Sequence, residues 1–392
     1  MAGDAGRPTR GPHPHGRSPH PYPRPDQARA VAAGGPGGGA VVVVGAASPL
    51  GAALARRLAT DLAQVARGDA SASPLAPARV VAVDVRLPAE DLGGARWARV
   101  DLRGPALPRL LDAEDAAVVV DVTLLPGARG GRGGGPPVGL HVVAAAQRAR
   151  GVRRLVLASS TGVYGASPRA PSVRGEDAEL APPSGGAERR ASEVEAALRA
   201  AGRRRPDQAS AVLRLADVVG PGLRTPLGDW LEVPAVPCLW GHDPRLQVLH
   251  ADDAVEALRL AALGDVTGVV NVAGEGVVTL QQAAALCGRP VLPVPAAALA
   301  VTARALSGRA VDPPWSDAAR VLRSGRVVDL ARMRADLGLA PRWTSRGAVE
   351  DLARGRGLAG PLSPEVRAAA AERVGRAVRG ARGLLAAAGG PR

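Results

Sequence analysis

The sequence predicts an α/β protein in which a doubly wound parallel sheet is followed by a second, smaller α/β lobe. Between residues 41 and 215, short β-branched or apolar runs alternate with amphipathic helical patterns, and a turn bounded by Gly45 and Gly51 follows the first run directly. Strands that alternate with helices are joined by right-handed crossovers, which make the strands parallel and place helices on both faces of the sheet. We expect the sheet domain over residues 40–216 and the lobe over residues 217–355.

The first strand–turn–helix unit shows the pattern most clearly. Residues 41–44 are four consecutive valines, and leucines recur every fourth residue from Leu50 to Leu62, which places them on one face of a helix. A third strand–helix pair is expected over residues 100–111. Further strands are expected at residues 79–84, 117–122, 154–158 and 211–215, and further helices at residues 138–150 and 188–200.

Beyond Gly220 the pattern is less regular, because four prolines interrupt short segments over residues 221–237. A strand at residues 269–272 and helices at residues 253–262, 280–287 and 346–354 are still expected. We interpret this region as a lobe that closes over the carboxyl ends of the strands.

Both ends of the chain differ in composition from the rest. Residues 1–39 contain eight Pro and nine Gly, which is typical of a disordered leader. Residues 356–392 form a basic tail with a helical pattern over residues 364–385. A basic amphipathic helix can contact an acidic membrane or a partner, but its small apolar face favours a loosely docked or solvated helix.

The net charge of +14 does not by itself indicate a nucleic-acid-binding protein. Residues 1–39 carry +3 and residues 361–392 carry +4, so half of the excess lies in the tails. With five Trp, two Tyr and no Phe, the chain offers few surfaces on which bases stack. No specific nucleic-acid partner is therefore expected.

Cysteine usage and hydropathy argue against several other classes. Cys238 and Cys287 stand alone without metal-ligand spacing, so neither a disulfide framework nor a metal site is expected. The N-terminus lacks the apolar region of a signal peptide, and no run approaches the length of a membrane span. A cytoplasmic protein is expected.

The chain contains no lysine, so all 50 basic residues are arginine. Ile is also absent and Asn271 is the single Asn, which is the pattern that a very GC-rich gene produces. The chemical consequence is independent of that cause: a Schiff base, a P-loop lysine or a Tyr-Lys proton relay is excluded.

The turn over residues 45–51 has the features of a dinucleotide site. Gly45 permits the tight turn after the strand, Gly51 allows close packing of helix on strand, and Ser48 holds the middle position that needs a small residue. Leu50 belongs to the same turn, and the helix N-terminus offers amide donors to phosphates. Ser48 replaces the usual Gly, and its hydroxyl is able to bond phosphate.

Asp84 ends the second strand, where an acid is placed to accept hydrogen bonds from an adenosine ribose. It lies 39 residues after Gly45, against about 20 in the usual fingerprint. A 12-residue insertion that begins at Arg67 accounts for much of the difference. Because a carboxylate repels a 2′-phosphate, NAD is favoured over NADP, although the nearby Arg86 weakens that preference.

Two longer runs are more specific. The Ser-Ser-x-x-Val-Tyr-Gly run at residues 159–165 and the Arg-x-x-x-x-x-Gly-Pro run at residues 214–221 occur in order with the stretches at 100–102, 246–253 and 270–274. In these features residues 41–352 resemble the extended short-chain dehydrogenase/reductases, in their NAD-dependent epimerase/dehydratase branch. The resemblance implies a Rossmann sheet that binds NAD, with Asp101 and Leu102 beside the adenine. It also makes the second lobe a substrate-binding lobe.

The same resemblance implies roles for four further residues. Ser160 matches the Ser or Thr that hydrogen-bonds the reacting sugar hydroxyl, and Asp217 stands where the family usually has an Asn that touches substrate. Arg245 and His250 fall in the segment that lines the sugar-nucleotide pocket. The implied substrate is a nucleotide sugar or a related alcohol, and homodimers through paired helices are common in the family.

The family's base is a Tyr in a Tyr-x-x-x-Lys helix, and this chain departs from that pattern. The chain has two tyrosines, Tyr22 in the leader and Tyr164 within the serine run, so no alignment supplies the base. The matching helix begins near residue 184. The positions of the pair become Gly185 and Arg189 when the helix is aligned on Glu193, and Ala187 and Ala191 when it is aligned on Glu195.

Two residues are candidates to replace the missing pair in part. Arg189 is able to hold a ribose by hydrogen bonds but not to share the titration role of a lysine. Asp121, at the end of the fourth expected strand, is a candidate surrogate base, although a cap or loop carboxylate is the favoured interpretation. Two hypotheses follow: an epimerase/dehydratase-like enzyme whose hydride-transfer chemistry is impaired or altered, or a catalytically silent dinucleotide-binding sensor or scaffold.

Overall fold

The computed structural model describes residues 39–67, 79–126, 135–182, 186–307 and 318–358, together with residues 368, 372 and 375. Three expected segments lie almost entirely outside these ranges: the leader, the insertion after the first helix and the C-terminal helix. The disorder of the leader and the nature of the basic tail stay predictions.

The central sheet has seven strands, all paired in parallel. The order across it is β11-β6-β5-β4-β1-β2-β3. This confirms the predicted fold class, a doubly wound α/β sheet. The strand order reverses between β1 and β4, and ligands of such sheets bind at the carboxyl ends of the strands beside that point. The strands are β1 (Ala40–Val44), β2 (Arg79–Asp84), β3 (Arg96–Arg99), β4 (Ala116–Asp121), β5 (Arg154–Ser160), β6 (Ala209–Leu215) and β11 (Gly268–Val272).

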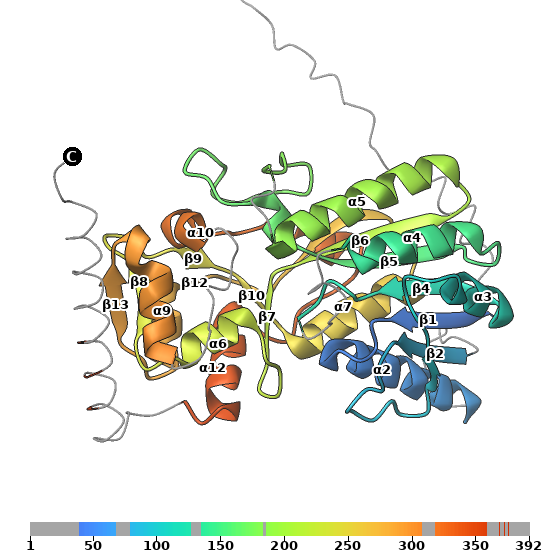
Figure 1. The fold of residues 1–392 in the computed structure, drawn as a ribbon, viewed down its shortest axis with the longest axis horizontal. Coiled ribbons are helices and arrows are strands. Elements are labelled where there is room, and N and C mark those ends of the chain that lie inside the picture. The colour runs from blue at the N-terminus through green and yellow to red at the C-terminus, as the bar shows by residue number, and fades with distance from the viewer. Residues whose placement is uncertain are drawn as a thin grey trace, which may run out of the picture.

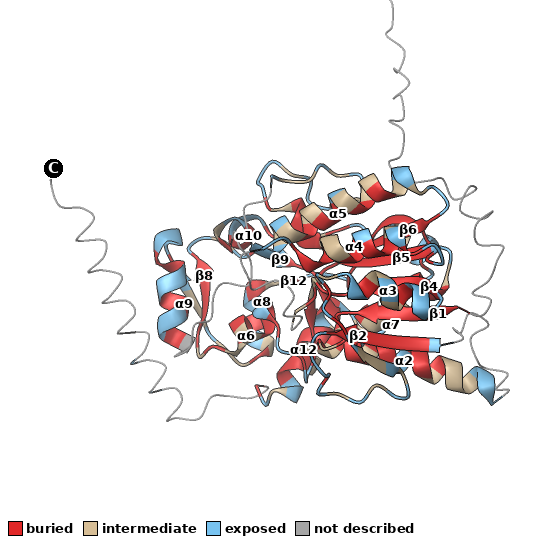
Figure 2. Cartoon of the chain, turned by 45° about the vertical axis from the view of Figure 1, so that its right-hand side comes forward, coloured by how far each residue is buried: buried red, intermediate tan, exposed pale blue. Residues whose placement is uncertain are grey.

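Helices cover both faces of the sheet (Figure 1). One layer contains α2 (Pro49–Ala66), α7 (Ala251–Leu263) and α11 (Ala331–Ala335), and the other contains α3 (Ala106–Ala113), α4 (Val138–Arg148) and α5 (Gly186–Arg204). Side chains alternate along β1, so that Val41 and Val43 enter the core of the first layer and Val42 and Val44 that of the second. Apart from the edge strand β3, the strands of the sheet are buried almost throughout, as Figure 2 shows.

The smaller lobe is built from short strand pairs and helices around its own core, in which Trp230 is fully buried. Its pairs are β7 (Asp217–Val219) with β10 (Val248–His250), β8 (Val236–Leu239) with β13 (Val291–Val294), and β9 (Arg245–Leu246) with β12 (Val278–Thr279). Its helices are α6 (Pro226–Glu232), α8 (Leu280–Leu286), α9 (Leu299–Ser307), α10 (Ala318–Ser324) and α12 (Ser345–Gly355). Two 3₁₀ turns complete the description, η1 (Thr161–Tyr164) and η2 (Ala296–Ala298).

The two parts of the chain interlock. Strand β11 and helices α7 and α11 follow residue 216 in sequence, yet they belong to the sheet layers. The third strand–helix pair was expected over residues 100–111, but it begins earlier, because its strand β3 already ends at Arg99. Among the described helices, none is long and apolar enough to cross a membrane.

Candidate functional site

The turn after β1 is tight and needs glycine at both ends. Gly45 has a φ of +95°, and a Cβ on Gly51 would lie 2.5 Å from the Gly45 carbonyl oxygen. Ser48 is fully buried and caps α2: its Oγ donates to the Gly45 carbonyl at 2.8 Å and accepts the Gly51 N–H at 3.1 Å. The Ser48 hydroxyl therefore uses its proton inside the turn, which stiffens the turn.

Asp84 joins the end of β2 to this turn. Its carboxylate accepts the Ala47 N–H at 3.0 Å and the Val85 N–H at 2.7 Å, and the residue is 7% exposed. The carboxylate keeps further acceptor positions, because each of its oxygens has two lone pairs. The sequence placed Asp84 beside the turn, and the structure brings the two together.

The remaining residues predicted to hold the cofactor lie around this edge. The N–H of Val100 donates to the Asp84 carbonyl at 3.0 Å, so the segment that carries Asp101 and Leu102 runs next to the end of β2. Asp101 is exposed and its carboxylate accepts the Arg103 N–H, whereas Leu102 is buried. Leu50 is also buried, in the core beneath α2.

Ser160 ends β5, and its hydroxyl begins the next turn. The residue is partly exposed and is the N-cap of η1, where its Oγ accepts the Gly162 N–H at 3.0 Å. The adjacent Ser159 points the other way, into the protein, because side chains alternate along a strand. Ser160 is thus held at the carboxyl edge of the sheet that also carries the Gly45 turn.

A buried polar network lies behind Ser160. Glu195 of α5 accepts hydrogen bonds from Ser159 Oγ at 2.6 Å and from Arg214 Nη2 at 2.8 Å. Arg214 also donates to Tyr164 Oη at 2.9 Å, and Tyr164 donates to Asn271 Oδ1 at 2.7 Å. The side chains of Glu195 and Arg214 are 0% and 3% exposed. The network ties β5, α5, β6 and β11 together.

The environment of this network shifts the titration of two of its members. Burial alone lowers the pKa of Arg214, but hydrogen bonds and charge from Glu195 outweigh it, so the pKa stands above its ordinary value. Burial raises the pKa of Tyr164, against the lowering effect of Arg214. Tyr164 is therefore a neutral structural donor, held inside the protein.

The sequence left open whether α5 is aligned with the family on Glu193 or on Glu195, and the network distinguishes these two glutamates. Glu195 faces the sheet, whereas the side chain of Glu193 is 37% exposed and pairs with Arg189 at 2.8 Å. Arg189 itself has a side chain that is 64% exposed. Glu195 is thus the inward residue of this helix, and the role predicted for Arg189 at a ribose stays a prediction.

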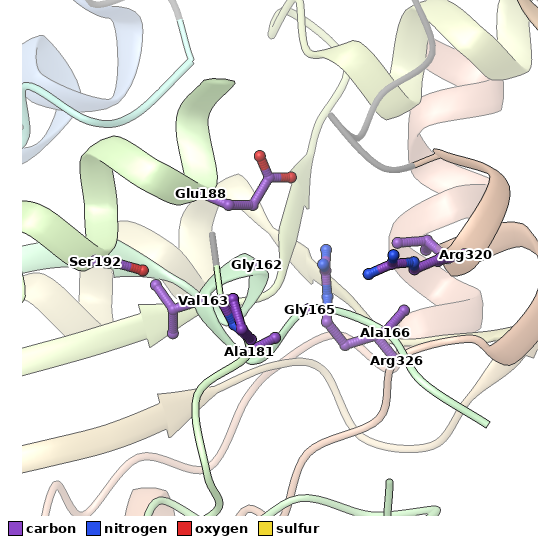
Figure 3. Close-up of a pocket in the computed structure, with 11 residues that line it drawn as sticks. Gly162, Val163, Gly165, Ala166, Ala181, Glu188, Ser192, Arg320 and Arg326 are labelled. Carbon is purple, nitrogen blue, oxygen red and sulfur yellow. The ribbon is translucent and has the colours of Figure 1, made fainter. Parts of the chain in front are cut away.

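A small cavity of about 20 Å³, partly open to solvent, lies next to the turn that follows Ser160, between α5 and α10 (Figure 3). Ser160 itself is not among the residues that line it. Glu188 and Ser192 come from the α5 side, and Arg320 and Arg326 from the opposite side. Backbone and small side chains complete the lining: Gly162, Val163, Gly165, Ala166, Ala181, Pro182 and Val321. The cavity therefore combines a carboxylate, a hydroxyl and two guanidinium groups.

Asp217 and Arg245 both contact Arg326, which lines this cavity. The Arg326 guanidinium donates to Asp217 Oδ2 at 3.3 Å, and the Arg326 N–H donates to the Arg245 carbonyl at 2.9 Å. The Arg245 side chain is exposed. Gly325 permits this arrangement, because a Cβ there would lie 2.4 Å from the Arg245 carbonyl oxygen.

His250 and Asp121 are placed differently. His250 is buried, accepts the Asp252 N–H as the N-cap of α7, lies 3.2 Å from Asp351 and stacks on Trp343. It is not among the residues that line the cavity. These contacts are those of a structural residue, and its predicted place in a sugar pocket stays a prediction.

Asp121 is 1% exposed. Its Oδ1 accepts both the N–H and the hydroxyl of Thr123, and its Oδ2 has no partner among the described residues. That oxygen lies against Gly139 of α4 and Val194 of α5. Burial raises the pKa of Asp121 from 3.8 to about 6, against the hydrogen bonds from Thr123. Asp121 is not among the residues that line the cavity.

Sequence reasoning missed Glu188, Ser192, Arg320 and Arg326. Glu188 and Ser192 lie on α5, the helix that carries the Tyr and Lys in the family. Their spacing of about one helical turn was the available signal that they share a face. The two arginines lie more than 150 residues from Ser160 in sequence, and no local pattern marks them. Among the described residues, no group of three or more His, Cys, Asp or Glu side chains is placed to hold a metal ion.

Two mycobacterial relatives show how far the likeness extends along the sequence. The Uncharacterized protein Rv0501 of Mycobacterium tuberculosis (strain ATCC 25618 / H37Rv) is 37% identical over 355 residues, which cover 86% of this chain and 90% of that protein. The Uncharacterized protein Rv2047c of the same strain is 32% identical over 129 residues, which cover 31% of this chain and 14% of that protein.

Solved structures and a family profile place the fold and the sequence in the same group. MoeE5 in complex with UDP-glucuronic acid and NAD has a TM-score of 0.58 at 23% identity and covers 81% of this chain and 98% of its own. The UDP-glucose 4-epimerase of Thermus thermophilus in complex with NAD has a TM-score of 0.57 at 19% identity and covers 82% and 100%. Residues 138–273 match the NAD dependent epimerase/dehydratase family. The chain belongs to that family.

Proposed function

We propose that this protein binds NAD at the turn between β1 and α2 and a nucleotide sugar, or a related alcohol, in the cavity beside Ser160. We further propose that its hydride-transfer chemistry is impaired or altered by the loss of the Tyr-Lys pair. One observation carries the proposal: the Gly45 turn with Asp84, and Ser160 with its cavity, both lie at the carboxyl edge of one doubly wound sheet.

The residues of the turn fit the pyrophosphate and adenosine half of NAD. A Cβ on Gly45 or Gly51 would meet neighbouring protein atoms, so both glycines keep the turn tight, and a phosphate would lie at the N-terminal end of α2. Asp84 would accept hydrogen bonds from the adenosine ribose and would repel a 2′-phosphate. When bound, NAD supplies the hydride acceptor.

Three groups around the cavity support a nucleotide sugar. Ser160 offers a hydroxyl, and the guanidinium groups of Arg320 and Arg326 suit the negative charge of a diphosphate or a sugar carboxylate. MoeE5 has been solved with UDP-glucuronic acid and with UDP-glucose, which are substrates of this chemical class.

The altered chemistry is supported by the start of α5. With Glu195 as the inward glutamate, Ala187 and Ala191 stand at the positions of the Tyr and the Lys. Loss of a general base slows a proton-transfer step by about 10²–10⁴-fold, which leaves room for residual turnover. Asp121 remains a candidate surrogate for that base.

The second candidate is a catalytically silent dinucleotide-binding sensor or scaffold. The same absence of Tyr and Lys supports it, because the turn and the cavity do not depend on either residue. A cytoplasmic location and a homodimer belong to both candidates, and cell fractionation and light scattering test them.

Calorimetric titration of the full chain with NAD⁺, NADP⁺, UDP-glucose and UDP-glucuronic acid tests the proposed function. We expect NAD⁺ to bind more tightly than NADP⁺. The Asp84→Asn variant should bind NAD⁺ about tenfold more weakly, since a hydrogen bond to a charged group contributes about 1.5–3 kcal/mol. Asp91→Asn is the control, because Asp91 is an exposed carboxylate in the loop after β2.

Tighter binding of NADP⁺ would overturn the role of Asp84. If neither dinucleotide binds, both candidate functions are wrong. NAD⁺ binding without a nucleotide sugar would leave the cofactor site in place and reject the substrate.

A further inference from the structure

The first two turns of α5 present two polar side chains to the cavity. Glu188 and Ser192 are four residues apart, so they lie on one face of the helix, and both line the cavity (Figure 3). Glu188 is half-buried. Neither residue belongs to the network at Glu195, which faces the sheet.

Glu188 reaches the immediate surroundings of Ser160. The position that a Cβ would take on Gly162 lies 2.8 Å from Glu188 Cγ and 3.1 Å from Ser160 Oγ. The carboxyl carbon of Glu188 lies 3.7 Å from the same position, so the carboxylate and the Ser160 hydroxyl lie on either side of Gly162. A substrate hydroxyl held by Ser160 would therefore lie within reach of the Glu188 carboxylate.

The Ser192 hydroxyl independently indicates a ligand at this place. Its Oγ is buried and has no hydrogen-bond partner among the described residues. Buried polar atoms are nearly always hydrogen-bonded, so one that lines a cavity and has no partner among the described residues marks a place for a ligand hydroxyl or a water. A hydroxyl-rich ligand such as a sugar supplies one.

Glu188 is better placed than Asp121 to act on such a ligand. The free oxygen of Asp121 lies against Gly139 and Val194 in the interior, whereas Glu188 lines the cavity. A general base must lie within hydrogen-bond reach of the proton that it removes, so geometry decides between the two carboxylates.

We propose that Glu188 is the general base of this site in place of the missing Tyr, and that Ser192 binds a neighbouring substrate hydroxyl. This inference rests on the proposed function. The Glu188 carboxylate takes the proton of the sugar hydroxyl as its O–H bond breaks. The C–H bond of the same carbon breaks, the C=O bond forms, and the hydride passes to NAD⁺, so the sugar is oxidised to a ketone and NAD⁺ is reduced to NADH.

Among the described residues that line the cavity, the charged groups opposite Glu188 are Arg320 of α10 and Arg326, of which the second is hydrogen-bonded to Asp217. On its own helix, the nearby Arg189 pairs with Glu193. The guanidinium groups of Arg320 and Arg326 hold an anionic substrate in front of Glu188.

The test uses the full chain with saturating NAD⁺ and UDP-glucose or UDP-glucuronic acid, and compares the wild type with Glu188→Gln, Ser192→Ala and the control Glu193→Gln. Calorimetry measures binding of both ligands, and absorbance measures NADH. We expect Glu188→Gln to bind both ligands within a few-fold of the wild type and to form NADH about 10²–10⁴-fold more slowly.

Two further readouts separate a base from a structural residue. The wild-type rate should fall as the pH is lowered, because a protonated carboxylate accepts no proton, and Glu188→Gln should lose this dependence. Ser192→Ala should weaken nucleotide-sugar binding by about 3–10-fold, which is the contribution of one ordinary hydrogen bond. Glu193→Gln should match the wild type in every measurement.

The outcomes are distinct. If both ligands bind and Glu188→Gln keeps the wild-type rate, or the wild type forms no NADH at any pH, the role of Glu188 is overturned while the proposed binding function stands. If calorimetry detects no binding by the wild type, the proposed function fails, and this inference fails with it.

Discussion

Along one stripe of α5, Glu195 is fully buried and hydrogen-bonded to Ser159 and Arg214 on the sheet side, whereas three residues earlier, on the cavity side, the buried hydroxyl of Ser192 has no partner among the described residues. Glu188, Ser192 and Glu195 follow each other at intervals of four and three residues, so they lie on the same stripe of the helix and differ in position along it. The paired carboxylate of Glu195 completes the fold, and the unpaired hydroxyl of Ser192 is the group that the proposed ligand would bind. Paired burial holds strands and helix together, and unpaired burial at a cavity indicates a binding site.

The largest expected effect tests the buried side. Glu195→Gln removes the counter-charge of Arg214, whose side chain is 3% exposed, and an uncompensated buried charge costs about 3–5 kcal/mol of unfolding free energy. Glu193→Gln is the matched control two residues away, and its exposed pair with Arg189 should contribute less than about 1 kcal/mol. Urea unfolding measures both variants. Equal losses would mean that the buried network does not organise the helix.

The next effect concerns a buried carboxylate that is only partly paired, on the sheet side of α5. The folded-state pKa of Asp121 is about 6, above the 3.8 of an unperturbed Asp, so the folded protein binds the proton more tightly than the unfolded chain. Unfolding free energy should therefore fall as the pH rises from about 4 to about 6, by roughly 3 kcal/mol, and stay level above that window. Asp121→Asn should lose this contribution. The difference between wild type and variant, followed by urea unfolding across pH, checks it, and a difference independent of pH would contradict it.

The smallest effect compares one serine from each side. Ser159→Ala removes a hydrogen bond to the Glu195 carboxylate and should cost about 1.5–3 kcal/mol. Ser192→Ala removes a hydroxyl without a partner among the described residues and should change stability by no more than about 0.5 kcal/mol. Thermal and urea unfolding of the two variants sharpen the comparison. A large loss for Ser192→Ala would show that its hydroxyl supports the fold.

Much of the fold was predictable because it follows from local patterns. The valine run of β1 and the leucines of α2 are short-range periodicities, and the turn between them needs Gly45 and Gly51 for steric reasons that act within seven residues. Asp84 was predictable because the carboxyl ends of adjacent parallel strands meet at one edge. Composition alone established that no lysine takes part in any chemistry of this protein.

The tertiary structure decided what depends on contacts between distant segments. Glu193 and Glu195 are equivalent in sequence spacing, and only the position of Arg214 on β6 reveals which of them faces the sheet. Arg326 reaches the cavity because the lobe folds back onto β5 across more than 150 residues. Periodicity records which face of an element is apolar, but it carries no information about which distant polar side chain will complete a site. That information arises only when the two parts of the chain pack together.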